Sequence, residues 1–126
     1  MRFIAAAALG MVADLFAMGD GYGYTARMEQ THAATFVAAL VALFLVTAVL
    51  NFGAQRTVAV AAMVWAGMST AHTFVLIAET SRDPTSHSLW PFEYASILLL
   101  VLPALVGAAV GRLTDAARTS RARNKI

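Results

Sequence analysis

Four long apolar stretches, separated by short polar segments, dominate the pattern of hydrophobic and polar positions along the chain. They cover residues 3–19, 33–52, 57–79 and 92–111. A helix that crosses about 30 Å of hydrocarbon at about 1.5 Å per residue needs about 20 residues. The last three stretches have that length. The pattern therefore predicts a single all-α domain, an antiparallel bundle of four transmembrane helices with short connections.

The first stretch is the shortest of the four and carries an acidic residue, Asp14. A cleaved signal peptide is the alternative interpretation, because Arg2 followed by an apolar run resembles the charged and hydrophobic regions of such a peptide. Against it, Asp14 interrupts the run, and no convincing small-residue cleavage site precedes Gly19. We therefore expect this helix to be retained. If it were cleaved, three spans would remain.

Composition supports a lipid environment and narrows the possible chemistry. The chain is 60% hydrophobic and 13% charged, whereas soluble domains average about 45–50% and about 25%. Cysteine is absent, which excludes disulfides, thiolate metal sites and cysteine nucleophiles. The sequence contains no nucleophile elbow, phosphate-binding loop or zinc-protease motif. Whether the protein is an enzyme stays open, and a non-enzymatic role is favoured.

The basic residues predict how the bundle is oriented. Only two of them, Arg27 and Arg82, fall on one side of the predicted bundle, together with most of the acids: Asp20, Glu29, Glu79, Asp83 and Glu93. The other seven fall on the opposite side: Arg2, Arg56, Arg112, Arg118, Arg121, Arg123 and Lys125. Short loops rich in arginine and lysine stay in the cytoplasm. We therefore predict a multi-pass protein of a bacterial inner membrane with both termini in the cytoplasm.

The basic residues also bear on partners. They cluster at predicted membrane edges and do not alternate with aromatic residues, so a nucleic-acid partner is not expected. The partner that the composition implies is the lipid bilayer. The basic tail, residues 112–126, either contacts anionic headgroups or simply sets the topology.

Two ionisable residues lie at least one turn inside predicted spans, Asp14 in the first and His72 in the third. A charged side chain at the centre of a bilayer costs about 2.5–3.5 kcal/mol on insertion scales, so each needs a partner or a purpose. The spacing of five residues places them on one helix face: Trp65, Ser69, His72, Leu76 and Glu79. One interpretation is a proton or ligand site shared with Asp14. The other is an interhelical hydrogen bond that holds the bundle together.

Three histidines raise the question of a cofactor. His32 begins the second span and His87 lies in the last loop, on the same side as His72. No histidine pair with helical ligand spacing and no haem-attachment motif is present. No cofactor is predicted, although haem or a metal at His32, His72 or His87 stays an alternative.

The fourth span carries small residues at helical spacing. Gly107 and Gly111 fit the small-x-x-x-small pattern that lets helix backbones approach closely, and Pro103 adds a bend. This face packs either within the bundle or against a partner protein.

The segment VWAGMSTAH at residues 64–72, followed by a polar loop with His87 and a fourth span, resembles small four-helix bacterial inner-membrane proteins of the DoxX-like kind. The resemblance implies a four-helix membrane fold and draws attention to His72.

Three functional hypotheses follow. The first is an accessory subunit of a larger transport or respiratory complex, docked through Gly107 and Gly111. The second is a small homo-oligomeric transporter or proton-coupled carrier that uses Asp14 and His72. The third is a haem-binding or metal-binding redox protein that uses His32 and His72.

Overall fold

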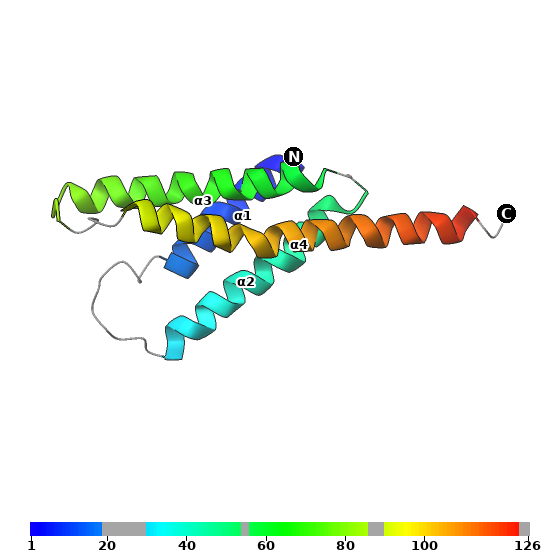
Figure 1. Ribbon diagram of the computed structural model, residues 1–126, viewed down its shortest axis with the longest axis horizontal. Helices are drawn as coiled ribbons and strands as arrows, with labels where there is room; N and C mark the ends of the chain where they lie inside the picture. The colour runs from blue at the N-terminus through cyan, green and yellow to red at the C-terminus, as the bar shows by residue number, and fades with distance from the viewer. Residues whose placement is uncertain (19–29, 54–55, 86–89, 124–126) are drawn as a thin grey trace.

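The described part of the chain is entirely helical between its turns (Figure 1). A computed structural model describes residues 1–18, 30–53, 56–85 and 90–123. They form the helices α1 (Arg2–Met18), α2 (Gln30–Asn51), α3 (Thr57–Thr80) and α4 (Trp90–Arg123). The prediction of an all-helical chain with four helices is confirmed over these residues. Three of the helices, α2, α3 and α4, are long and apolar enough to cross a membrane.

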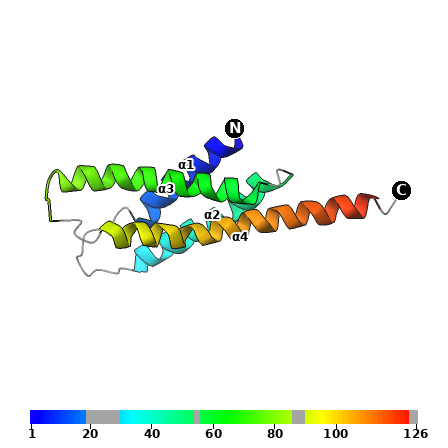
Figure 2. The ribbon, with the colours of Figure 1, turned by 45° about the horizontal axis from the view of Figure 1, so that its top comes forward.

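Helices α1 and α3 run in one direction, and α2 and α4 run in the other (Figures 1 and 2). The most extensive contacts join α1 to α3 and α2 to α4, and α3 also packs along α4. We call the end of the bundle that carries Arg2, Arg56 and Arg112 the basic end. The opposite end, which carries Glu79, Asp83 and Glu93, is the acidic end. Figure 1 shows α2 diverging from α3 and α4 toward the acidic end, while α4 extends well past the bundle at the basic end.

Two glycines bring α1 and α3 into backbone contact. A Cβ atom added to Gly10 would collide with the carbonyl oxygen of Val64, and one added to Gly67 would collide with the carbonyl oxygen of Ala7. Gly10 lies three residues after Ala7, whose carbonyl meets Gly67. In the same way, Gly67 lies three residues after Val64, whose carbonyl meets Gly10. This reciprocal pattern belongs to parallel helices that cross closely at small residues, and it places Gly10 level with Gly67.

A second pair of glycines brings α4 against α2. A Cβ atom on Gly107 would collide with the carbonyl oxygen of Phe44, and one on Gly111 with that of Ala48. The small-residue face of the fourth span therefore packs within this chain. Helix α4 continues through Pro103.

An apolar core fills the bundle between its two ends. All four helices contribute buried hydrophobic residues to it: Ala6, Ala13, Leu43, Val60, Val64, Met68, Ile97, Leu100, Ala104 and Ala108. Burying one of the larger apolar side chains away from water stabilises a fold by about 1.5–3 kcal/mol. In lipid this stabilisation is smaller, because the surroundings are apolar as well. Close packing and the glycine contacts then hold the helices together.

Asn51 closes the core at the basic end. Its fully buried side chain donates from Nδ2 to the Thr57 hydroxyl at 2.9 Å and to the Ala108 carbonyl at 2.7 Å. Its Oδ1 accepts from the Arg56 amide at 3.0 Å. One side chain thereby joins the end of α2 to the start of α3 and to α4. The predicted span 33–52 includes Asn51, but the sequence gives no sign of these contacts.

We expect Asn51→Leu to destabilise the folded bundle by about 1–3 kcal/mol, because it leaves buried backbone groups without their partner. Unfolding followed by circular dichroism in mild detergent measures the change. Thr70→Val is the control, since the exposed Thr70 hydroxyl bonds only to Ala66 in its own helix. A stability of Asn51→Leu equal to that of the control would contradict this role.

Candidate functional site

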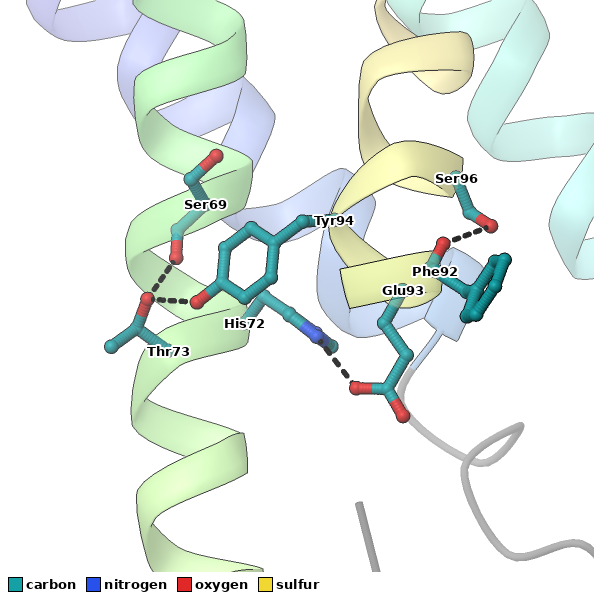
Figure 3. Close-up of polar contacts among 7 residues, drawn as sticks. All are labelled: Ser69, His72, Thr73, Phe92, Glu93, Tyr94 and Ser96. Atoms are coloured by element: carbon teal, nitrogen blue, oxygen red, sulfur yellow. Dashed lines mark hydrogen bonds and ion pairs between the residues drawn. The ribbon is translucent and has the colours of Figure 1, made fainter. Parts of the chain in front are cut away.

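A buried histidine and a carboxylate face each other between α3 and α4 near the acidic end (Figure 3). His72 is fully buried, and its Nε2 lies 3.1 Å from Oε2 of Glu93. The Glu93 side chain is 15% exposed. A ring protonated at Nε2 donates to the carboxylate, and a second proton at Nδ1 turns the contact into an ion pair. We call these two residues the His72–Glu93 pair.

Local structure explains why the carboxylate lies there. Helix α4 begins at Trp90, so Glu93 belongs to its first turn. A negative charge in a first turn is favoured by the positive end of the helix dipole. Helices α3 and α4 are antiparallel, and Asn51 bonds to both Thr57 on α3 and Ala108 on α4. The same register brings position 93 opposite position 72.

Tyr94 holds the two helices together beside the pair. Its hydroxyl lies 2.6 Å from Oγ1 of Thr73, which itself donates to the Ser69 carbonyl at 2.7 Å. The Tyr94 hydroxyl is therefore the donor to Thr73. The tyrosine ring meets the His72 ring edge to face at 5.1 Å between centroids, and meets Trp90 in the same way at 6.1 Å. These contacts fix the orientation of the imidazole.

Asp14 lies at the same level of the bundle, on α1. Gly10 is level with Gly67, and one turn further along both helices Asp14 is level with Ala71. Ala71 precedes His72 in the sequence. Asp14 is 1% exposed, and its Oδ1 has no hydrogen-bond partner. The structure thus brings Asp14 and His72 to one level, while the Nε2 of His72 hydrogen-bonds to Glu93. A buried carboxyl oxygen without a partner is unusual and needs an explanation.

The other residues of the predicted stripe lie apart from the pair. Trp65 is 43% exposed on the bundle surface, and Glu79 lies at the acidic end of α3. Each is seven residues from His72, which is about 10 Å along a helix. Ser69 is closer, and its buried Oγ has no hydrogen-bond partner.

The acidic end keeps a fixed negative charge beyond the pair. The amide and the hydroxyl of Thr85 both donate to Oδ1 of Asp83, at 2.9 Å and 2.7 Å. These bonds, the hydroxyl first, lower the pKa of the exposed Asp83 carboxyl below its ordinary value. Asp83 therefore stays ionised at neutral pH and favours cations near this end of the bundle.

Of the three histidines of the alternative cofactor site, the structure describes the side chain of His72. His32 lies in the first turn of α2, but its side chain lies outside what the structure describes, and so does His87 as a whole. Among the described residues, no three histidine, aspartate or glutamate side chains gather closely enough to hold a metal ion.

Comparisons with known protein families, with curated proteins and with solved structures find no match. The chemistry of the His72–Glu93 pair and of Asp14 therefore stands on the geometry of this chain. Glu93 and Tyr94 are the site residues that sequence reasoning missed. An acid in the first turn of a span was the available signal, and the charge pattern instead grouped Glu93 with the solvated acids.

Proposed function

We propose that this chain is an integral protein of a bacterial-type inner membrane, that it crosses the bilayer four times, and that its basic end faces the cytoplasm. Three helices long and apolar enough to cross support this. Helix α1 is shorter, at 17 residues, but its backbone contact with α3 gives it a place in the same bundle. The basic residues at one end supply the orientation.

Within that membrane, the protein binds and releases a proton at the His72–Glu93 pair and works as a small homo-oligomeric proton-coupled carrier. The observation that carries this proposal is the fully buried imidazole 3.1 Å from a carboxylate. Imidazole is the side chain that ordinarily changes charge nearest neutral pH. Ionisable residues inside membrane spans are costly and mark proton or ion pathways.

The energetic cost of the pair favours a functional role over a purely structural one. An interhelical hydrogen bond alone needs only neutral groups, as the Tyr94–Thr73 bond beside the pair illustrates. Burying two ionisable groups adds a desolvation penalty that well-packed apolar residues avoid. The buried Asp14, whose Oδ1 has no hydrogen-bond partner, adds a second such penalty at the same level.

The other hypotheses receive less support. Gly107 and Gly111 contact α2 of the same chain, so docking as an accessory subunit needs a different interface. A redox role through His72 would compete with the contact between its Nε2 and Glu93.

Proton uptake into vesicles tests the proposal. The purified protein is reconstituted with a pH-sensitive dye enclosed, and a pH step is applied in the presence of a potassium ionophore. We expect uptake faster than in empty vesicles. Glu93→Gln and His72→Gln remove the proton-binding chemistry and are expected to lower uptake to the empty-vesicle rate.

The control is Thr70→Ala on the same helix, which is expected to keep the uptake of the unmodified protein. Size-exclusion chromatography and circular dichroism establish that each variant is folded. Unchanged uptake by folded Glu93→Gln and folded His72→Gln would remove the pair from the mechanism.

A further inference from the structure

The polar cluster at the acidic end and the Asn51 cluster at the basic end are separated by a thick apolar layer. His72 lies fifteen residues along α3 from Thr57, the hydroxyl that Asn51 binds, which is about 22 Å of helix. Three α3 residues between them, Val60, Val64 and Met68, are at most 1% exposed. The other helices contribute further buried residues to the same layer: Ala6, Leu43, Ile97, Leu100 and Ala104.

No polar relay crosses this layer among the described residues. Their buried polar or charged side chains are Asp14, Thr47, Asn51 and His72. The buried Oγ of Ser69 lies within one turn of His72 on α3. Asp14 is level with the His72–Glu93 pair. Thr47 lies beside Gly107, close to Asn51, and its hydroxyl donates to carbonyls of its own helix. An apolar interior packed this closely does not hold water, so a proton or cation finds no path from His72 toward the basic end.

Toward the acidic end the pair reaches the surface. Glu93 is its partly exposed member, at 15%, and Trp90, one turn earlier on α4, is 53% exposed. Figure 3 shows the Glu93 carboxylate on the side of the His72 ring where the acidic end of α4 begins. Helix α2 diverges from α4 toward this end (Figure 1).

We infer that the His72–Glu93 pair exchanges its ligand with the acidic end alone, and that the apolar layer around Val64, Met68 and Leu100 closes it from the basic end. The inference rests on the proposed site but not on the identity of the ligand. For a carrier, this structure is then the state open to the outside, and delivery to the cytoplasm requires the apolar layer to separate.

Single-cysteine labelling tests the inference directly, because the natural chain has no cysteine. The site variant is Glu93→Cys, and the layer variants are Met68→Cys and Leu100→Cys. Two exposed positions mark the faces, Thr85→Cys for the acidic end and Ser120→Cys for the basic end. Each variant is reconstituted in sealed vesicles, and a charged, membrane-impermeant maleimide is added either outside or inside.

We expect Glu93→Cys to react only from the face that modifies Thr85→Cys, and never from the face that modifies Ser120→Cys. Met68→Cys and Leu100→Cys are expected to react from neither face. Modification of Glu93→Cys from the Ser120 face, or no modification from either face, overturns the inference. So does modification of both layer variants.

The labelling experiment and the proton-uptake experiment test the access inference and the carrier proposal separately. One-sided labelling of Glu93→Cys without proton uptake by the unmodified protein would retain the one-sided access and reject the carrier. Proton uptake with labelling from both faces would retain the carrier and reject the closed layer. Folding of each cysteine variant is established beforehand by its elution volume and circular dichroism.

Discussion

Replacing His72 with leucine is expected to destabilise the bundle by about 3 kcal/mol, the lower part of the range for breaking a buried charged pair. The change removes the imidazole that faces the Glu93 carboxylate at 3.1 Å. The 15% exposure of Glu93 lets water relieve part of the cost, which is why the lower value applies. Replacing both residues with leucine removes the desolvation penalty and is expected to restore most of the stability.

A double-mutant cycle measures this coupling. Stabilities of His72→Leu, Glu93→Leu and the double variant are compared by unfolding in mixed detergent micelles. The reference cycle uses the neutral pair beside it, with Thr73→Val and Tyr94→Phe, where we expect a coupling of about 1 kcal/mol. Additive costs for His72 and Glu93 would show that the two side chains do not interact in the folded protein.

The same double variant separates a functional pair from a structural one. If the pair only joins α3 to α4, the stable leucine double variant keeps the activity of the unmodified protein. If the pair holds the proton, the variant is folded and inactive. Stability and proton uptake measured on one sample therefore distinguish the two interpretations that the sequence left open.

The helices could be predicted because lipid leaves the backbone few alternatives. A segment without water to bond its amide groups must satisfy them internally, and a helix does so. The predicted third span, residues 57–79, differs by one residue from α3 (Thr57–Thr80). Helix α4 continues to Arg123, well past the predicted span, because its alanine and arginine residues are good helix formers in water.

The partner of His72 could not be predicted from periodicity. The depth of a residue in a span follows from counting, but the register between two spans depends on the connection. Helix α3 runs beyond the level at which α4 begins (Figure 1). The chain therefore returns into the bundle before Glu93, and an acid that the charge pattern placed with the solvated residues lies opposite His72.

The two glycine contacts also differ in whether the sequence predicts them. Gly107 and Gly111 lie four residues apart on one helix, so their spacing alone predicted a packing face. Gly10 and Gly67 are single glycines on different helices, and each is four residues from an alanine in an alanine-rich chain, so neither stands out. Their reciprocal fit appears only when α1 and α3 are placed together.

Gly67→Leu is expected to have the second large effect, separation of α1 from α3. Any Cβ at this position collides with the Ala7 carbonyl, and a backbone group cannot rotate away as a side chain can. Overpacking costs about 1–3 kcal/mol for small additions, and leucine adds a whole branched side chain. We expect loss of a cooperative unfolding transition in detergent. Ala62→Leu is the control, since Ala62 is exposed on the same helix.

The outcome also bears on whether the first helix is retained. A chain that had lost residues 1–18 would present Gly67 to lipid, where leucine is favourable, and Gly67→Leu would then be harmless. Destabilisation relative to Ala62→Leu therefore requires α1 to be present against α3. Equal stability of the two variants would mean that the contact between Gly10 and Gly67 is absent from the mature protein. Asp14 would then not lie level with His72 either.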